Sequence, residues 1–267
     1  MASCRPIGIF DSGVGGLTVA NAISSLLPKE TIYYIGDTAR IPYGNKSKEE
    51  IESYSLEMTR FLIDKNCKTI VIACNTASAY ALEAIRNNYP DIPVIAMEPA
   101  VKPAIEQSRT RVIGVLATQG TLKSERYENL KNRFGSGVSI VENPCIGLVD
   151  MIEAGKWNDK DTILLLKSFL LPMKEAQADH IVLGCTHYPI VIPAISDIMG
   201  NMVQLVNPAP AVAKQVQRQL AERNLLCFDI FQNESSPKHT VWATGTTFSF
   251  NYLLKELLPH SKLISLA

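Results

Sequence analysis

Short β-branched apolar runs recur along this 267-residue chain, and helix-length amphipathic segments lie between several of them. Strands this apolar are usually buried on both faces, as in parallel sheets that helices cover on each side. The pattern therefore predicts an α/β protein with mainly parallel sheets. The runs that we expect to form strands are RPIGIF (5–10), TIYYIG (31–36), KTIVIA (68–73), IPVIA (92–96), RVIGVLA (111–117), VSIVE (138–142), HIVLG (180–184), MVQLV (202–206) and HTVWAT (239–244).

Two of the intervening segments carry clear helix signals. Ser47 and Glu50 have the spacing of a capping box, which predicts a helix beginning at this point. Apolar residues after position 208 recur at helical spacing, which predicts a second helix with one buried face. These residues are Ala209, Val212, Ala213, Val216 and Leu220.

The charge balance limits the classes of partner. Lys and Arg together number 26, and so do Asp and Glu, which argues against a nucleic-acid or anionic-membrane surface as the main function. The most apolar stretch, 181–206, is interrupted by His187 and Asp197 and is not expected to span a membrane. We recognise no signal-peptide pattern after Met1. These features predict a cytoplasmic protein whose six cysteines are reduced thiols.

The chain resembles itself at a nearly constant offset. The stretch 8–13 matches 114–119, the stretch 70–76 matches 181–186, and Glu98-Pro99-Ala100 matches Asn207-Pro208-Ala209. We interpret the matches as duplicated α/β halves, which would form two domains. The expected division is a discontinuous first domain of residues 1–97 and 208–267 and a continuous second domain of residues 98–207, with hinges near 98 and 207.

Both halves end their third strand in a cysteine that is followed by a polar turn. Ligands of open α/β sheets bind outside the carboxyl ends of the strands, so Cys74 and Cys185 are expected to face one cleft. A cysteine that opens a helix lies near backbone N–H groups that stabilise a thiolate. His187 could support Cys185, and Asp11, at the end of the first strand, could support Cys74. Two thiols on opposite faces of one ligand could invert a carbon centre.

Other interpretations of the two cysteines stay open from these residues alone. They could be structural, or they could form a disulfide with each other, although a reducing compartment disfavours one. A zinc site made of Cys74, Cys185 and His187 would need a fourth ligand. A hydrolase with a Cys–His pair is a further alternative, but it leaves the second cysteine without a role.

A glycine-rich turn, DSGVGG (11–16), lies between the first predicted strand and a helix. It lacks both the GxGxxG spacing and a following GK[ST], so a dinucleotide or nucleotide phosphate site is weakly supported. The turn could be no more than a tight strand-to-helix connection. A cradle for the carboxylate of a ligand agrees better with the other residues of the predicted cleft.

Five stretches together resemble the cofactor-independent glutamate racemases of the aspartate/glutamate racemase superfamily. The stretches are FDSGVGGLTV (10–19), GDTARIPYG (36–44), ACNTASA (73–79), the TxGT turn Thr118–Thr121 and GCTHYP (184–189). They lie in the order that the family has, and the similarity extends over about residues 7 to 250.

The resemblance implies two pseudo-symmetric Rossmann-like α/β domains with an active site at their interface. It also implies interconversion of L- and D-glutamate, with no cofactor and no metal, and a role in supplying D-glutamate for peptidoglycan. It implies that Cys74 and Cys185 are the two acid–base residues, that Asp11 assists Cys74, that His187 assists Cys185, and that Glu153 is a further acid of the catalytic site. A homodimer is an open alternative. The residues that match substrate-binding positions are Asp11, Ser12, Pro42, Tyr43, Gly44, Asn75, Thr76, Thr118, Thr121 and Thr186.

Two positions depart from the family pattern. Asn207 stands where an acidic residue is common, and Thr246 stands where an Asp is common. Both are outside the catalytic motifs and are expected to affect packing or hinge behaviour. The rival functions are an aspartate racemase and a non-catalytic amino-acid-binding protein, which would need no pair of reactive thiols.

Overall fold

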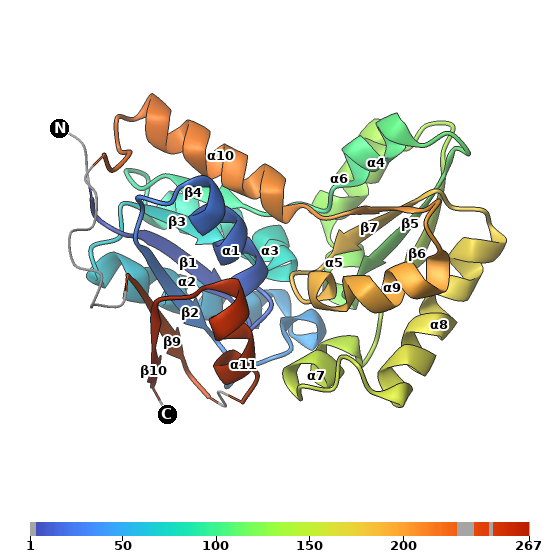
Figure 1. Ribbon diagram of the computed structural model, residues 1–267. Coiled ribbons are helices and arrows are strands. Elements are labelled where there is room, and N and C mark those ends of the chain that lie inside the picture. Colours follow the sequence, from blue (N-terminus) through green and yellow to red (C-terminus); the bar gives the residue numbers. More distant parts are fainter. Residues whose placement is uncertain (1–3, 229–237, 246–247, 267) are drawn as a thin grey trace.

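The strands of the protein form two separate parallel sheets. The computed structural model describes residues 4–228, 238–245 and 248–266. The first lobe contains a six-stranded sheet in the order β10-β9-β2-β1-β3-β4, and the second lobe contains a four-stranded sheet in the order β6-β5-β7-β8 (Figure 1). The strands are β1 (Ile7–Asp11), β2 (Ile32–Gly36), β3 (Thr69–Ile72), β4 (Val94–Ala96), β5 (Val112–Ala117), β6 (Ser139–Asn143), β7 (His180–Gly184), β8 (Gln204–Val206), β9 (His239–Ala243) and β10 (Ser261–Ser265).

Helices cover both faces of each sheet, as the apolar strands predict. In the first lobe, Ile9 packs on one face of the sheet toward α1 and α10, while Phe10 packs on the other toward α2 and α3. The helices are α1 (Leu17–Leu26), α2 (Lys48–Asp64), α3 (Asn75–Asn88), α4 (Val101–Gln107), α5 (Gln119–Leu122), α6 (Glu125–Phe134), α7 (Leu148–Glu153), α8 (Lys160–Glu175), α9 (Ile192–Met199), α10 (Ala209–Glu222) and α11 (Phe248–Leu257), with 3-10 turns η1 (Tyr43–Asn45) and η2 (Tyr188–Val191).

Local sequence signals account for where several of these helices begin. The Ser47 hydroxyl accepts the Glu50 N–H at 3.2 Å, and the Glu50 carboxylate accepts the Ser47 N–H at 2.9 Å, so the predicted capping box is confirmed. The apolar face predicted after position 208 is buried in α10, which packs against α1. Asn207 accepts the Ala209 N–H at 3.0 Å and so acts at the start of α10, in agreement with a packing role.

The two sheets repeat one strand order. The order β2-β1-β3-β4 in the first lobe has its counterpart in β6-β5-β7-β8 in the second. The sequence matches fall on equivalent elements: β1 with β5, β3 with β7, and the segments that follow β4 and β8. The chain crosses between the lobes after β4 and returns after β8 (Figure 1). The domain boundaries at 97/98 and 207/208 stay a prediction.

The nine predicted strands are all present, and among the described residues the first sheet has one strand more than the sequence indicated. Strand β10 is short, lies at the edge of the first sheet and pairs with β9 alone, and none of its residues is fully buried. An edge strand of this kind lacks the apolar run that identified the others. The departure at Thr246 lies outside the described residues. Within the described part of the chain, none of the helices is both long and apolar enough to cross a membrane.

The expectation that all six cysteines are reduced is wrong for two of them. Cys4 and Cys227 form a disulfide. Pro6 accepts the Lys68 N–H at 2.9 Å, and Glu30 accepts the Cys227 N–H at 2.9 Å, so both cysteine-bearing segments are held at the amino end of the first sheet. The two cysteines are 223 residues apart in the sequence, which gives no local signal of their pairing. Cys67, Cys74, Cys145 and Cys185 are free and buried.

Candidate active site

A small cavity lies where carboxyl ends of strands from both lobes meet. Cys74 directly precedes α3 in the first lobe, and Cys185 directly follows β7 in the second. The cavity is nearly closed, with a volume of about 10 Å³. Its walls are formed by Ser12, Pro42, Tyr43, Gly44, Cys74, Asn75, Thr76, Thr118, Val149, Gly184, Cys185, Thr186 and His187.

Cys74 is surrounded by groups of the first lobe. Its sulfur accepts the Ala77 N–H at 3.4 Å, and its thiol donates to the Ser12 hydroxyl at 3.8 Å. Burial, together with the negative charge of Asp11, raises the pKa of Cys74 to about 12. Cys74 is therefore a protonated thiol at neutral pH.

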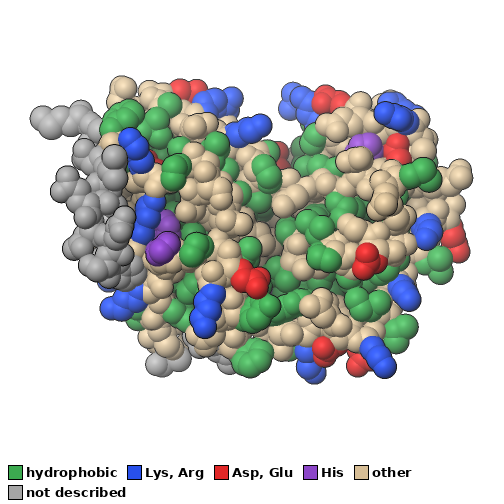
Figure 2. Space-filling view, viewed as in Figure 1, with side chains coloured by type: hydrophobic (Ala, Val, Ile, Leu, Met, Phe, Trp, Pro, Cys, Tyr) green, Lys and Arg blue, Asp and Glu red, His purple; other side chains and the backbone are tan. Residues whose placement is uncertain are grey.

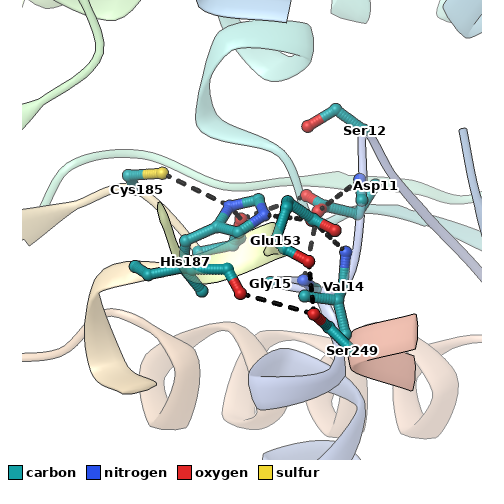
Figure 3. Close-up of polar contacts among 12 residues, drawn as sticks. Asp11, Ser12, Val14, Gly15, Glu153, Cys185, His187 and Ser249 are labelled. Carbon is teal, nitrogen blue, oxygen red and sulfur yellow. Dashed lines mark hydrogen bonds and ion pairs between the residues drawn. The ribbon is translucent and has the colours of Figure 1, made fainter. Parts of the chain in front are cut away.

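Cys185 has a histidine beside it. Its sulfur lies 3.7 Å from Nδ1 of His187, and the other ring nitrogen, Nε2, donates to Oε1 of Glu153 at 2.6 Å (Figure 3). Burial alone would lower the pKa of His187, but the contacts with Cys185 and Glu153 outweigh burial and raise this pKa well above its usual value. The Cys185 sulfur and the Glu153 carboxylate, which lie on either side of the ring, therefore both favour its protonated form.

Glu153 is the last residue of α7 and contacts His187, which lies 34 residues later in the sequence. Its carboxylate is largely buried, with 15% of the side chain exposed, and accepts the Val14 N–H at 2.7 Å. The sequence pattern around Glu153 is loose, and its partners, His187 and Val14, come only from the structure.

Asp11 does not hydrogen-bond to Cys74, the residue that it was expected to assist. Its carboxylate accepts the N–H groups of Gly13 and Gly16, both at 3.1 Å, and the Thr186 hydroxyl at 3.2 Å. Burial raises the pKa of Asp11, although the His187 charge and the two N–H groups act against this rise. Asp11 therefore influences Cys74 through its charge and contacts the Cys185 side through Thr186.

The glycine-rich turn holds carboxylates, but they belong to the protein. Gly13 and Gly16 bind Asp11, and Val14 binds Glu153. This corrects the expectation that these N–H groups receive the carboxylate of a ligand. The glycines also permit close approach: a Cβ on Gly13 would lie 2.0 Å from Glu153 Oε1, and a Cβ on Gly15 would lie 2.5 Å from His187 Nδ1.

Asn75 is the polar side chain that the protein leaves unpaired at this cavity. It is 4% exposed, and neither atom of its amide has a hydrogen-bond partner among the described residues. A buried unpaired amide is unfavourable by about 1–3 kcal/mol unless a ligand satisfies it. Beside it, the hydroxyls of Thr76, Thr118 and Thr121 lie within 2.8–3.2 Å of one another. Thr121 supports this cluster but does not form part of the cavity wall.

The loop Pro42–Gly44 forms part of the cavity wall. The Tyr43 hydroxyl donates to Asp37 at 2.5 Å and so anchors the loop. Asp37 also binds Arg40 at 2.7 Å and the Thr244 hydroxyl at 2.8 Å. The sequence did not identify Asp37 as the anchor, nor Val149 and Gly184 as wall residues, because the latter two carry no reactive group.

Comparisons with known proteins agree with this arrangement. The family described as Asp/Glu/Hydantoin racemase matches residues 16–216. A glutamate racemase of Ectopseudomonas mendocina is 44% identical over 96% of this chain and 95% of its own. A crystal structure of a glutamate racemase isoform from Bacillus anthracis superposes with a TM-score of 0.85 at 34% identity and covers 98% of both chains. A glutamate racemase from Francisella tularensis, solved in complex with D-glutamate, has a TM-score of 0.80 at 33% identity over 98% of both chains.

In this chain the two lobes repeat one strand order, a cysteine follows the third strand of each, and one cavity has both cysteines in its wall. The chain belongs to the Asp/Glu/hydantoin racemase family and, within it, to the glutamate racemases.

Proposed function

We propose that this protein interconverts L- and D-glutamate by a two-base mechanism in which Cys74 and Cys185 exchange protons with opposite faces of the α-carbon. The observation that carries the proposal is one cavity with a cysteine from each lobe in its wall. A single thiol would suffice for a hydrolase, whereas inversion of a carbon centre requires an acid–base group on each face.

The different surroundings of the two thiols support an assignment of direction. The high pKa of Cys74 keeps that residue a thiol, and the ring of His187 beside the Cys185 sulfur makes Cys185 the residue that we assign as the thiolate base. In this state Cys185 takes the α-proton of L-glutamate to give a carbanion, and the Cys74 S–H bond breaks as its proton adds to the other face. The reaction leaves D-glutamate, a Cys185 thiol and a Cys74 thiolate, which is the state that the reverse direction requires.

Substrate binding follows from the groups that remain available. The N–H groups of the glycine-rich turn already bind Asp11 and Glu153. We therefore assign two kinds of group to the carboxylates and amino group of the substrate: the amide of Asn75 and the hydroxyls of Ser12, Thr76, Thr118 and Thr186. The loop Pro42–Gly44 would enclose the bound substrate. The residues Asp11, His187 and Glu153 act on the thiols and not on the substrate carbon.

Entry of glutamate requires the lobes to separate. A volume of about 10 Å³ admits about one water, whereas ligand pockets of roughly 300–1,000 Å³ are usual for larger small molecules. Closure then excludes water and strengthens the interactions of charged groups with the carbanion.

D-glutamate made by this reaction would supply peptidoglycan synthesis, the role that the family resemblance implies. We propose a cytoplasmic location for the same reason. The Cys4–Cys227 disulfide is the structural feature that does not follow from a reducing compartment. A homodimer stays a prediction.

The test is purified protein with L-glutamate in D2O and no added cofactor, with α-proton loss followed by NMR and optical rotation recorded together. Exchange with loss of rotation supports racemisation, and the Cys74→Ala and Cys185→Ala variants should then each abolish it. Exchange without loss of rotation would indicate one working base and a different reaction. If both signals are absent with glutamate but present with aspartate, the protein is an aspartate racemase. If neither α-proton exchange nor loss of rotation occurs with either substrate, the result favours an amino-acid-binding protein.

A further inference from the structure

Glu153 is bound by both lobes at once. Its carboxylate belongs to α7 of the second lobe and accepts from His187 Nε2 of the same lobe at 2.6 Å. The same oxygen accepts the Val14 N–H of the first lobe at 2.7 Å. The Ser249 hydroxyl, also from the first lobe, donates to the main-chain carbonyl of Glu153 (Figure 3).

Ser249 lies directly against the end of α7. It is 3% exposed, lies in α11, and its hydroxyl is also 3.4 Å from the Ile152 carbonyl. The last carbonyls of a helix have no partner within the helix, so a donor from outside stabilises this end. Phe248 packs so closely on Gly155 that a Cβ at Gly155 would lie 2.7 Å from its ring. Hydrophobic side chains gather between the lobes in this lower part of the molecule (Figure 2).

We propose that Ser249 is a positioning residue: by holding the end of α7 against the first lobe, it places the Glu153 carboxylate where it orients His187 against Cys185. This inference rests on the proposed function, because it assigns Ser249 to the Cys185 half of the reaction. Ser249 forms no part of the cavity wall and touches no reacting atom.

Loss of the Ser249 contact should affect Cys185 and leave Cys74 unchanged. Cys74 hydrogen-bonds to Ser12 and to the Ala77 N–H, all within the first lobe, so loss of the Ser249 contact leaves these bonds in place. The ring of His187 contacts Cys185, and its orientation is set by the hydrogen bond to Glu153. Glu153 is in turn held in place where the two lobes meet. Closure of the lobes thereby completes the Cys185 side in particular.

The experiment compares Ser249→Ala with Ser261→Ala in the full-length protein. Ser261 also donates from its hydroxyl to a main-chain carbonyl, that of Leu258 at 2.7 Å, but it does so after the far end of α11 and within the first lobe. Loss of one hydrogen bond should lower kcat of Ser249→Ala about 2- to 10-fold, with less change in KM. Ser261→Ala should leave kcat unchanged.

Deuterium isotope effects separate positioning from general damage. With 2-deuterated L-glutamate, Cys185 removes the label, so a slower Cys185 step should raise the isotope effect on kcat/KM. With 2-deuterated D-glutamate, Cys74 removes the label, so the isotope effect should fall in the same variant. Partial unfolding lowers both rates and changes neither isotope effect. Unchanged isotope effects in Ser249→Ala would overturn the proposal.

A second readout does not depend on activity. The ring of His187 faces Cys185, Glu153 and Asp11, and its pKa can be followed by NMR of 15N-labelled histidine. Displacement of Glu153 in Ser249→Ala should lower this pKa, whereas Ser261→Ala should not change it. If the wild-type protein does not racemise glutamate and the pKa still falls, the proposed function fails while the positioning contact stands. An unchanged pKa would overturn the positioning role.

Discussion

Cys74 and Cys185 are the same side chain in two electrostatic surroundings. Cys74 is buried beside the negative charge of Asp11, which favours the neutral thiol, whereas the sulfur of Cys185 lies 3.7 Å from the ring of His187. The types of these residues could be predicted from the sequence. The partner of each could be predicted only in part: His187 contacts Cys185 as expected, but Asp11 bonds to Thr186.

The raised pKa of Cys74 can be measured by alkylation. A thiol whose pKa is raised stays protonated to higher pH, so the rate of iodoacetamide labelling at Cys74 should still rise about tenfold per pH unit as the pH passes 10. An unperturbed thiol is half ionised near pH 8.5, so its labelling rate would level off by about pH 10. Labelling should be mapped by peptide mass spectrometry in the Cys185→Ser variant, with glutamate present as a protection control. A plateau by about pH 10 would contradict the assignment.

At the scale of the element, the decisive feature is the turn between β1 and α1. Its glycines allow the backbone to approach Glu153 and His187 more closely than any side chain would permit, and its N–H groups bind two carboxylates of the site. The sequence indicates a turn of unusual glycine content. It does not indicate that the turn serves the protein's own acids, because Glu153 lies more than a hundred residues away.

Gly15→Ala should therefore damage the site more than the fold. The added Cβ would lie 2.5 Å from His187 Nδ1 and 2.7 Å from its main-chain nitrogen, so His187 must move. We expect kcat to fall about 100-fold, with a loss of about 1–3 kcal/mol in the free energy of unfolding. Gly200→Ala is the matched control: its φ of 83° makes alanine unfavourable, but nothing lies within 4 Å of the added atom. An equal loss of kcat in the two variants would contradict the prediction.

At the scale of the whole molecule, two lobes with the same strand order are joined by two crossings and meet at the cavity. The Cys4–Cys227 disulfide joins the chain ahead of β1 to the chain beyond α10, at the amino end of the first sheet. It therefore lies at the opposite end of β1 from Asp11 and the cavity. The disulfide should affect stability without affecting catalysis.

Thiol titration in denaturant tests this disulfide directly. Protein unfolded without reductant should expose four thiols, and reduced protein should expose six. Reduction, or Cys227→Ser, should lower the free energy of unfolding by about 2–5 kcal/mol, because the unfolded chain loses a long closed loop. The rate of racemisation at 25 °C should stay unchanged. Six thiols without reductant would rule the disulfide out.

The sequence by itself determined the alternation of strands and helices, the duplicated order of the two lobes and the chemical types of the reacting residues. These properties depend on local periodicity and on residues that end strands, which are written in neighbouring positions. The tertiary structure alone decided that Glu153 meets His187, that Asp11 meets Thr186, that Ser249 holds the end of α7, and that Cys4 pairs with Cys227. Each of these contacts joins segments distant in sequence, and their geometry comes from the packing of the two lobes.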